Sequence, residues 1–251
     1  MLSEKTSKAH RSETRPHKPS MTMSNVSEEE AAAIMADLLA ALEHMHSLNL
    51  IHRDVKVDNI FLRKRPIKGT SLSSNDFVLG DFGFSTRLGE DGFVHSCKLL
   101  TSFFLYFCFA ANLRSPRFPF SLAVCGSPIY MAPEVVQKKG ARSKREEEEM
   151  DERAYDTQAD VWSAGVVMFA LLTGNFPFSG EATKETFRRI VHDPLPMHKL
   201  VDAGLSQGCV SLLTSLLEKD LTLRVSASEA LRTSEWLHQH ARERVLRYPE
   251  K

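Results

Sequence analysis

The clearest hydrophobic pattern near the start of the chain predicts a helix that begins after Ser27. Four apolar residues recur at helical spacing and would share one face: Ile34, Leu38, Leu42 and Met45. Ser27 and Glu30 have the spacing of a capping box, in which each side chain accepts a hydrogen bond from the other residue's backbone N–H group. The pattern therefore predicts one amphipathic helix that ends near Asn49.

Two short apolar segments further along predict a β-hairpin, and most of the remaining pattern is helical. Ile60–Leu62 and Phe77–Leu79 flank a stretch rich in Lys, Ser, Gly and Asn, which is typical of a turn. Val161–Leu172 is apolar on nearly every face, as a fully buried helix is. Three more helices are expected, at Glu181–His192, Gly208–Leu217 and Ser226–Arg244. The expected fold class is mainly α with one small β-hairpin.

Charge and cysteine content exclude several classes of protein. The chain has 32 Lys and Arg residues and 32 Asp and Glu residues, so its formal net charge is +0. Nothing in the overall charge points to nucleic acid or to an anionic membrane. The four cysteines show no Cys-x-x-Cys spacing, which argues against a zinc site or a disulfide framework. We therefore expect a protein of the reducing cytoplasm with no nucleic-acid or membrane partner.

Composition divides the chain into one domain and two polar ends. Residues 1–25 are basic and rich in Ser and Thr without any hydrophobic period, which predicts disorder. The domain is expected over residues 26–240, followed by a tail at residues 241–251. Two insertions interrupt it, an apolar one at about residues 98–124 and a charged one at residues 137–153.

The apolar insertion contains the run Leu99–Ala111, which is shorter than the ~20 residues that a membrane-spanning helix needs. One hypothesis is a translated intron, because the pyrimidine-rich tract before a splice acceptor encodes Phe, Pro, Ser and Leu. The other is a loop that touches a membrane. The weak amphipathic order of the segment favours the intron.

The strongest chemical signal is the sequence HRDVKVDN, His52–Asn59, followed after the hairpin by Asp81-Phe82-Gly83. Phosphoryl transfer needs a carboxylate that accepts the substrate hydroxyl proton, oxygen ligands for Mg²⁺ and a cation near the transferred phosphate. Asp54 would be the catalytic carboxylate, and Lys56 would contact the γ-phosphate. Asn59 and Asp81 would hold the metal.

These motifs, together with the sequence APE that ends at Glu134, resemble the large lobe of the protein kinase family. The resemblance implies a kinase C-lobe fold that binds ATP and Mg²⁺ and acts on protein substrates. Lys56 and Ser127 stand where Ser/Thr-specific kinases have a Lys and a Ser or Thr, so the implied acceptor is a Ser or Thr hydroxyl. The sequence around Ser127, CGSPIYMAPE, resembles that of Unc-51-like kinases and of calcium- or energy-responsive kinases.

The resemblance also implies further roles around the nucleotide and the activation segment. Phe61 would form the floor of the adenine pocket, so the implied nucleotide-binding set is Lys56, Asn59, Phe61 and Asp81. Arg53 would bind a phosphate of the activation segment. Asp160 would brace the catalytic loop, and Glu134 would pair with Arg224 in a structural role.

One half of a kinase has no counterpart in the sequence. The chain contains no Gly-rich G-x-G-x-x-G loop, and the first kinase-like element is the helix after Ser27. We therefore expect the N-terminal β lobe to be missing and this chain to be weak or inactive on its own. The alternative is a non-catalytic binding module that retains the kinase fold. The sequence indicates neither the oligomeric state nor the substrate motif.

Overall fold

The computed structural model describes residues 26–64, 71–89, 128–139 and 156–247. Several predictions lie outside these residues: the disordered N-terminus, the apolar insertion, most of the charged insertion and the position of Ser127. The absence of an N-terminal β lobe also stays a prediction, because residues 1–25 are outside the described part.

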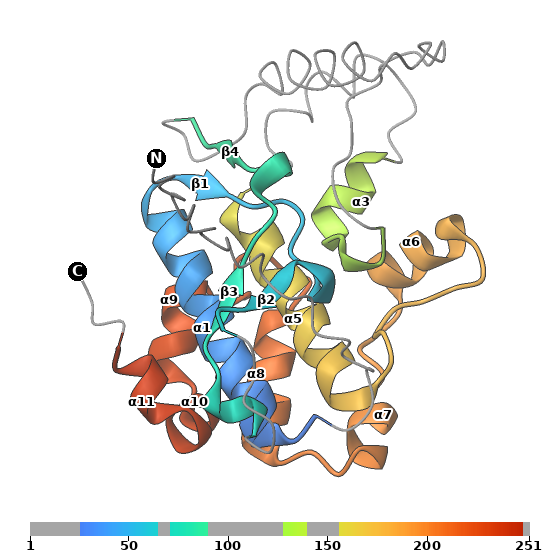
Figure 1. The fold of residues 1–251 in the computed structure, drawn as a ribbon. Helices are drawn as coiled ribbons and strands as arrows, with labels where there is room; N and C mark the ends of the chain where they lie inside the picture. Colours follow the sequence, from blue (N-terminus) through green and yellow to red (C-terminus); the bar gives the residue numbers. More distant parts are fainter. Residues whose placement is uncertain (1–25, 65–70, 90–127, 140–155, 248–251) are drawn as a thin grey trace, which may run out of the picture.

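The described residues form a mainly helical body, as the sequence predicts, with two small antiparallel sheets (Figure 1). The helices are α1 Glu28–Ser47, α3 Pro133–Lys139, α5 Thr157–Thr173, α6 Thr183–His192, α7 Met197–Asp202, α8 Gln207–Leu216, α9 Ala227–Thr233, α10 Glu235–His240 and α11 Arg242–Val245. The strands are β1 Leu50–Ile51, β2 Ile60–Leu62, β3 Phe77–Leu79 and β4 Thr86–Arg87.

Helix α1 begins with the predicted capping box. The Ser27 hydroxyl accepts from the Glu30 N–H at 3.2 Å, and the Glu30 carboxylate accepts from the Ser27 N–H at 3.1 Å. The helix is more buried than an amphipathic pattern implies, because every residue from Ala31 to Ala40 is buried. Alanines fill much of that stretch, so helices α5, α9 and α10 can approach α1 on several sides.

Helix α5 is the second central element and confirms the prediction of a fully buried helix. Asp156 caps its N-terminus by accepting from the Gln158 N–H at 2.8 Å, and Gly174 ends it in a left-handed conformation with φ of 68°. Trp162 and Phe169 are completely buried. A Cβ at Gly165 would lie 2.9 Å from the Leu217 side chain, so glycine is required for the close approach of α5 and the end of α8.

The predicted hairpin forms, and a second strand pair joins it. β2 and β3 pair antiparallel, with Ile60 opposite Leu79 and Leu62 opposite Phe77. Burial alternates along both strands, which places the outer residues of each triplet in the core. β1 and β4 also pair antiparallel. Their two-residue length carries too little alternation to be predicted.

The C-terminal helices differ from the single helix predicted over Ser226–Arg244. Ser234 has an extended conformation with ψ of 105°, and its side chain accepts from the Leu237 N–H to start α10. Ala241, with φ of −137°, separates α10 from α11. The short helix α7 was also not predicted. Arg244 and Val245 are buried, so the packed structure continues into residues that the sequence pattern assigns to a tail.

Arg244 forms a buried ion pair with Asp37 that joins α11 to α1 and to the hairpin. Its Nη1 lies 2.5 Å from Asp37 Oδ2, and its Nη2 donates to the carbonyl oxygens of Ser73 at 2.7 Å and Asn75 at 2.6 Å. The same Asp37 oxygen accepts from the Phe77 N–H at 2.8 Å. Burial raises the pKa of Asp37, and the guanidinium of Arg244 opposes that rise.

Replacing Arg244 by methionine should destabilise the fold most strongly at neutral and alkaline pH. The variant leaves the Asp37 carboxylate buried without its cation, and we expect a loss of about 3 kcal/mol at pH 7.5. A raised carboxyl pKa means that the folded state binds the proton more tightly than the unfolded state. Stability from this group is therefore present at low pH and lost as pH rises. The loss should be smaller at pH 5 than at pH 7.5.

Urea denaturation of the wild type and R244M at both pH values measures this effect. R242M changes an exposed arginine of the same helix and should leave the midpoint nearly unchanged. A destabilisation of R244M that is the same at both pH values would contradict the role of Asp37.

Candidate active site

The carboxylate of Asp160 on α5 accepts hydrogen bonds from the backbone of the loop between β1 and β2. Its Oδ2 accepts from the His52 N–H at 2.8 Å, and its Oδ1 accepts from the Arg53 N–H at 2.9 Å. The same Oδ2 lies 3.1 Å from Nε2 of His46, at the end of α1. Asp160 is only 2% exposed. These contacts confirm the prediction that Asp160 braces this loop.

Arg53 takes a backbone conformation that is strained for a residue with a side chain. Its φ is 66°, in the left-handed region, which costs of order 1–3 kcal/mol for a non-glycine residue. The hydrogen bond to Asp160 stabilises this conformation, and the Arg53 Nε donates to the Phe84 carbonyl oxygen at 2.6 Å. The turn at Arg53 thereby connects the loop to the segment after Asp81.

Three predicted side chains converge beyond this turn. Lys56 Nζ lies 2.6 Å from Asp54 Oδ2, and Asn59 Nδ2 donates to the same oxygen at 3.0 Å and to the Asp54 carbonyl oxygen at 2.8 Å. The Asp54 side chain is only 2% exposed, whereas that of Lys56 is 21% exposed. Both of these hydrogen bonds to the carboxylate fall on Oδ2. Among the described residues Oδ1 makes none, so it can accept a proton from a substrate hydroxyl.

His52 links this loop to Gly80 and Phe82, the two neighbours of Asp81 in the sequence. The Asp54 N–H donates to His52 Nδ1 at 3.3 Å, so Nδ1 is the acceptor in a neutral ring. Nε2 then carries the hydrogen and donates to the Gly80 carbonyl oxygen at 3.1 Å. The ring also contacts Phe82 edge-on, with centroids 5.2 Å apart.

Asp81 and Asn59 provide oxygen atoms that suit a magnesium ion. Asn59 donates through Nδ2, so its Oδ1 stays available as a ligand. Asp81 is exposed, has a left-handed backbone with φ of 62°, and accepts through Oδ1 from the Gly83 N–H at 3.4 Å. The described residues contain no cluster of three or more His, Cys, Asp or Glu side chains that could hold a metal. A site with one carboxylate is still typical of Mg²⁺, which takes its other ligands from water and substrate phosphates.

Phe61 lies on β2, next to the strand that leads to Asp81. A Cβ at Gly80 would lie 2.8 Å from its ring, so glycine is required for the ring to pack against the backbone there. The predicted residues therefore lie on three consecutive parts of the chain: the loop between β1 and β2, the hairpin, and the segment that follows β3. These residues are Arg53, Asp54, Lys56, Asn59, Phe61 and Asp81. Ser127 lies outside the described residues.

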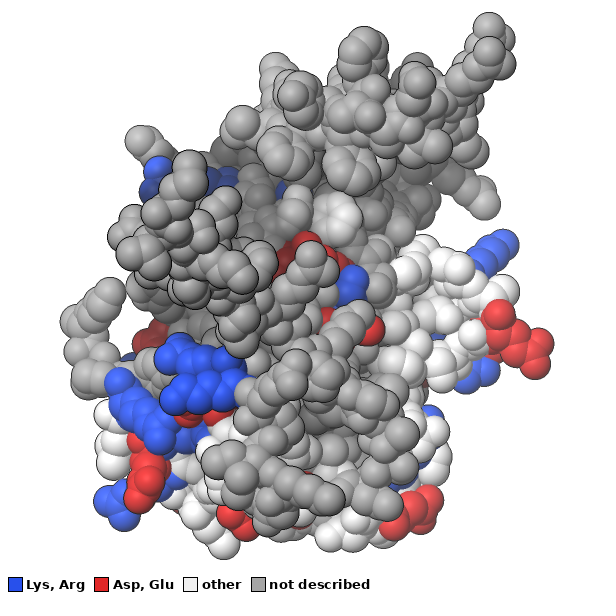
Figure 2. All heavy atoms as spheres, viewed as in Figure 1, with Lys and Arg blue, Asp and Glu red and all other residues white. Residues whose placement is uncertain are grey.

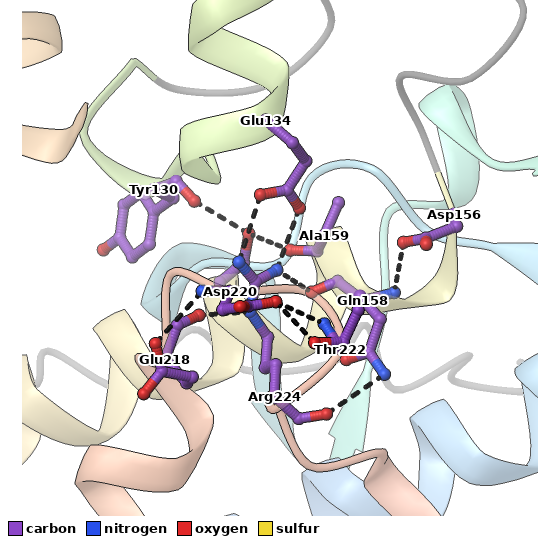
Figure 3. Close-up of polar contacts among 10 residues, drawn as sticks. Tyr130, Glu134, Asp156, Gln158, Ala159, Glu218, Asp220, Thr222 and Arg224 are labelled. Atoms are coloured by element: carbon purple, nitrogen blue, oxygen red, sulfur yellow. Dashed lines mark hydrogen bonds and ion pairs between the residues drawn. The ribbon is translucent and has the colours of Figure 1, made fainter.

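The predicted ion pair between Glu134 and Arg224 is present (Figure 3). Arg224 Nη1 and Nη2 donate to the two Glu134 carboxylate oxygens at 2.8 and 3.1 Å. Arg224 also donates to the carbonyl oxygens of Glu218 at 2.7 Å and Gln158 at 2.9 Å, and it lies over the Trp162 ring. These contacts attach α3 to α5 and to the loop after α8.

Tyr130 is a site residue that the sequence reasoning missed. It is buried, and this burial raises the pKa of its hydroxyl to about 12, although a backbone hydrogen bond from Val57 opposes the rise. Its carbonyl oxygen accepts from the Ser163 hydroxyl at 2.8 Å. Tyr130 therefore joins the segment before α3 to both the loop that contains Asp54 and α5. Its position four residues before Glu134 is the only sequence signal for this role.

No helix in the described ranges is long and apolar enough to cross a membrane.

Replacing Asp160 by alanine should unfold the loop between β1 and β2 and destabilise the protein. Two buried backbone N–H groups would lose their acceptor, at about 1–3 kcal/mol each. The strained turn at Arg53 would also lose its support. Urea denaturation should show a loss of about 3 kcal/mol. D202A removes an exposed aspartate from α7 and should leave the midpoint unchanged; equal midpoints for the two variants would contradict the bracing role.

Comparisons with known proteins identify the family to which this arrangement belongs. The sequence profile of the protein kinase domain matches residues 12–237. The human hormonally up-regulated neu tumor-associated kinase is 31% identical over 218 residues, which is 85% of this chain and 23% of that protein. The serine/threonine-protein kinase PEPKR2 of Arabidopsis thaliana is 28% identical over 206 residues, 82% of this chain and 33% of that protein. Myosin light chain kinase A of Dictyostelium discoideum is 26% identical over 205 residues, 82% of this chain and 54% of that protein.

The chain spans only about a quarter of the length of the human relative and about half of the Dictyostelium one. The likeness nevertheless extends over most of this chain and includes the loop, the hairpin and the segment around Glu134. The chain belongs to the protein kinase family.

Proposed function

We propose that this chain transfers the γ-phosphate of ATP to Ser or Thr hydroxyls of protein substrates. The observation that carries the proposal is the convergence of Lys56 and Asn59 on one oxygen of the buried Asp54 carboxylate. A carboxylate held in this way has a fixed orientation before any substrate binds. Positioning of this kind is the main contribution of the protein to phosphoryl transfer.

In the proposed reaction Asp54 Oδ1 accepts the proton of the substrate hydroxyl as its oxygen attacks the γ-phosphorus. The bond between the γ-phosphorus and the β,γ-bridging oxygen breaks, and ADP leaves. The Lys56 side chain is 21% exposed and can contact the transferred phosphate while it orients Asp54. The negative charge on the phosphate oxygens is thereby met by a cation already in place.

Asn59 and Asp81 would hold the magnesium ion, through the amide oxygen and the carboxylate respectively. When bound, Mg²⁺ neutralises charge on the phosphate oxygens. Phe61 would contact the adenine ring from β2. Arg53 would bind a phosphate carried by the activation segment, and Ser127 would lie in the part of that segment that meets the substrate.

Two features support the Ser/Thr class and the protein substrate. Lys56 lies two residues after Asp54, the spacing of Ser/Thr-specific kinases, and its ammonium contacts the Asp54 carboxylate. One of the relatives is named a serine/threonine-protein kinase. These relatives are longer than this chain. We therefore propose, in addition, that the chain is active by itself.

The alternative function is a non-catalytic binding module. The observation in its favour is that Phe82 is 54% exposed and Phe84 is also exposed, next to the residues that would hold the nucleotide. Exposed aromatic rings at such a place suit a protein contact. The two functions differ in whether the chain binds nucleotide and transfers phosphate.

Titration of Mg²⁺-ATP into the purified chain by calorimetry separates the two functions. We expect the wild type to bind nucleotide and D81N to lose this binding, since the variant removes the only carboxylate proposed for the metal. In the D54N variant nucleotide binding should persist, whereas phosphate transfer to casein should fall about 10²-fold or more.

No binding by the wild type would contradict the proposed activity of this chain and favour the binding module. Equal transfer by D54N and the wild type would contradict the role of Asp54. A thermal melt of each variant serves as the control for folding.

A further inference from the structure

A cluster of positive side chains lies at the end of the hairpin that is furthest from the catalytic loop. Figure 2 shows Lys and Arg side chains gathered on the left of this face, in the region of α11 in Figure 1. Arg247 Nη1 lies 2.9 Å from Asp76 Oδ1, and Arg244 Nη1 lies 3.7 Å from the same atom. Asp76 precedes β3, and its carbonyl oxygen accepts from the Arg63 N–H at 2.9 Å.

Arg63 is therefore opposite Asp76, one residue beyond the paired part of β2 and β3, and cross-strand neighbours of this kind have their side chains on the same face. Lys64 follows directly, and both Arg63 and Lys64 are exposed. Neither side chain makes a hydrogen bond or ion pair with another described residue. We call the four cations Arg63, Lys64, Arg244 and Arg247 the basic cluster.

The basic cluster carries more positive charge than the carboxylates paired with it can neutralise. Its four cations meet two carboxylates, Asp37 and Asp76, which leaves an excess of two positive charges. Exposed Arg242 and Glu243 of α11 cancel each other. The whole chain has a formal net charge of +0, so this excess is local.

An apolar side chain accompanies the basic cluster. Leu246 is 63% exposed, directly before Arg247, which is itself 53% exposed at its side chain. Exposed cations next to an exposed leucine suit a partner that presents carboxylates together with an apolar residue. A nucleic-acid backbone offers no aliphatic side chain to contact Leu246, so the combination of exposed cations and leucine favours a protein segment.

We propose that the basic cluster and Leu246 form a docking surface for an acidic segment of a partner protein. Direct contacts would run from the free groups of Arg63 and Lys64, and from the outer face of Arg247, to carboxylates of that segment. The hairpin strand between Asn59 and Arg63 spans about 13 Å, so a docked segment lies close to the catalytic loop. Docking there would raise the local concentration of the rest of the partner near Asp54.

The test titrates a fluorescein-labelled peptide of three Glu-Glu-Leu repeats into the full chain, followed by fluorescence anisotropy. We expect binding at low salt that weakens at 0.15 M salt, where the Debye length falls to about 8 Å. The double variant R63E/K64E places like charges against the peptide and should weaken binding about tenfold or more. L246S should weaken it by a smaller factor.

The matched control is K184E/R188E, which changes the total charge equally at two exposed positions of α6. It should bind the peptide nearly as tightly as the wild type. Equal weakening by both double variants, or no binding by the wild type, would overturn the proposal. Tighter binding of single-stranded DNA or phosphatidylserine vesicles than of the peptide, lost in R63E/K64E, would also overturn it. Because the readout is binding, a failure of phosphate transfer has no effect on this test.

Discussion

The buried carboxylate of Asp160 connects the helical core to the residues that we propose carry the chemistry. It accepts from two successive backbone N–H groups, those of His52 and Arg53, and so holds a turn that a non-glycine residue does not adopt freely. The side chains after that turn, Asp54 first, can meet only if the backbone reverses there. Because α5 is buried on every side, the carboxylate cannot move to relieve the strain.

Two buried arginines join elements that are distant in sequence. Arg224 lies between α3, α5 and the loop after α8, and Arg244 lies between α1, the hairpin and α11. A buried ion pair adds little net stability, since desolvation offsets most of the Coulomb attraction. Each guanidinium also bonds to backbone carbonyl oxygens, which lets one side chain fix three segments in a single arrangement. Their contribution is therefore to the uniqueness of the fold more than to its free energy.

The predictive value of the sequence depended on how local each signal was. Ser27 and Glu30 are three residues apart, and the apolar triplets at Ile60 and Phe77 carry their own strand pattern, so both elements were predicted. The division of the last helix at Ser234 was missed, because a serine can cap a helix or continue one, and its ψ of 105° follows from packing. The pairing of Asp37 with Arg244 spans 207 positions and has no local signal.

The two halves of the candidate site are constrained to different extents. Asp54, Lys56 and Asn59 bond to one another, and Asp54 is almost completely buried, so the side that would receive a substrate hydroxyl is ordered by this part of the chain. Asp81 is exposed and accepts only a 3.4 Å hydrogen bond from Gly83 in the described residues, while Phe82 contacts His52 edge-on and is 54% exposed. The nucleotide side thus depends on contacts that the described residues do not supply. A bound nucleotide with its metal ion, or further protein packed against Phe82, would order Asp81 and complete the arrangement that Asp160 begins.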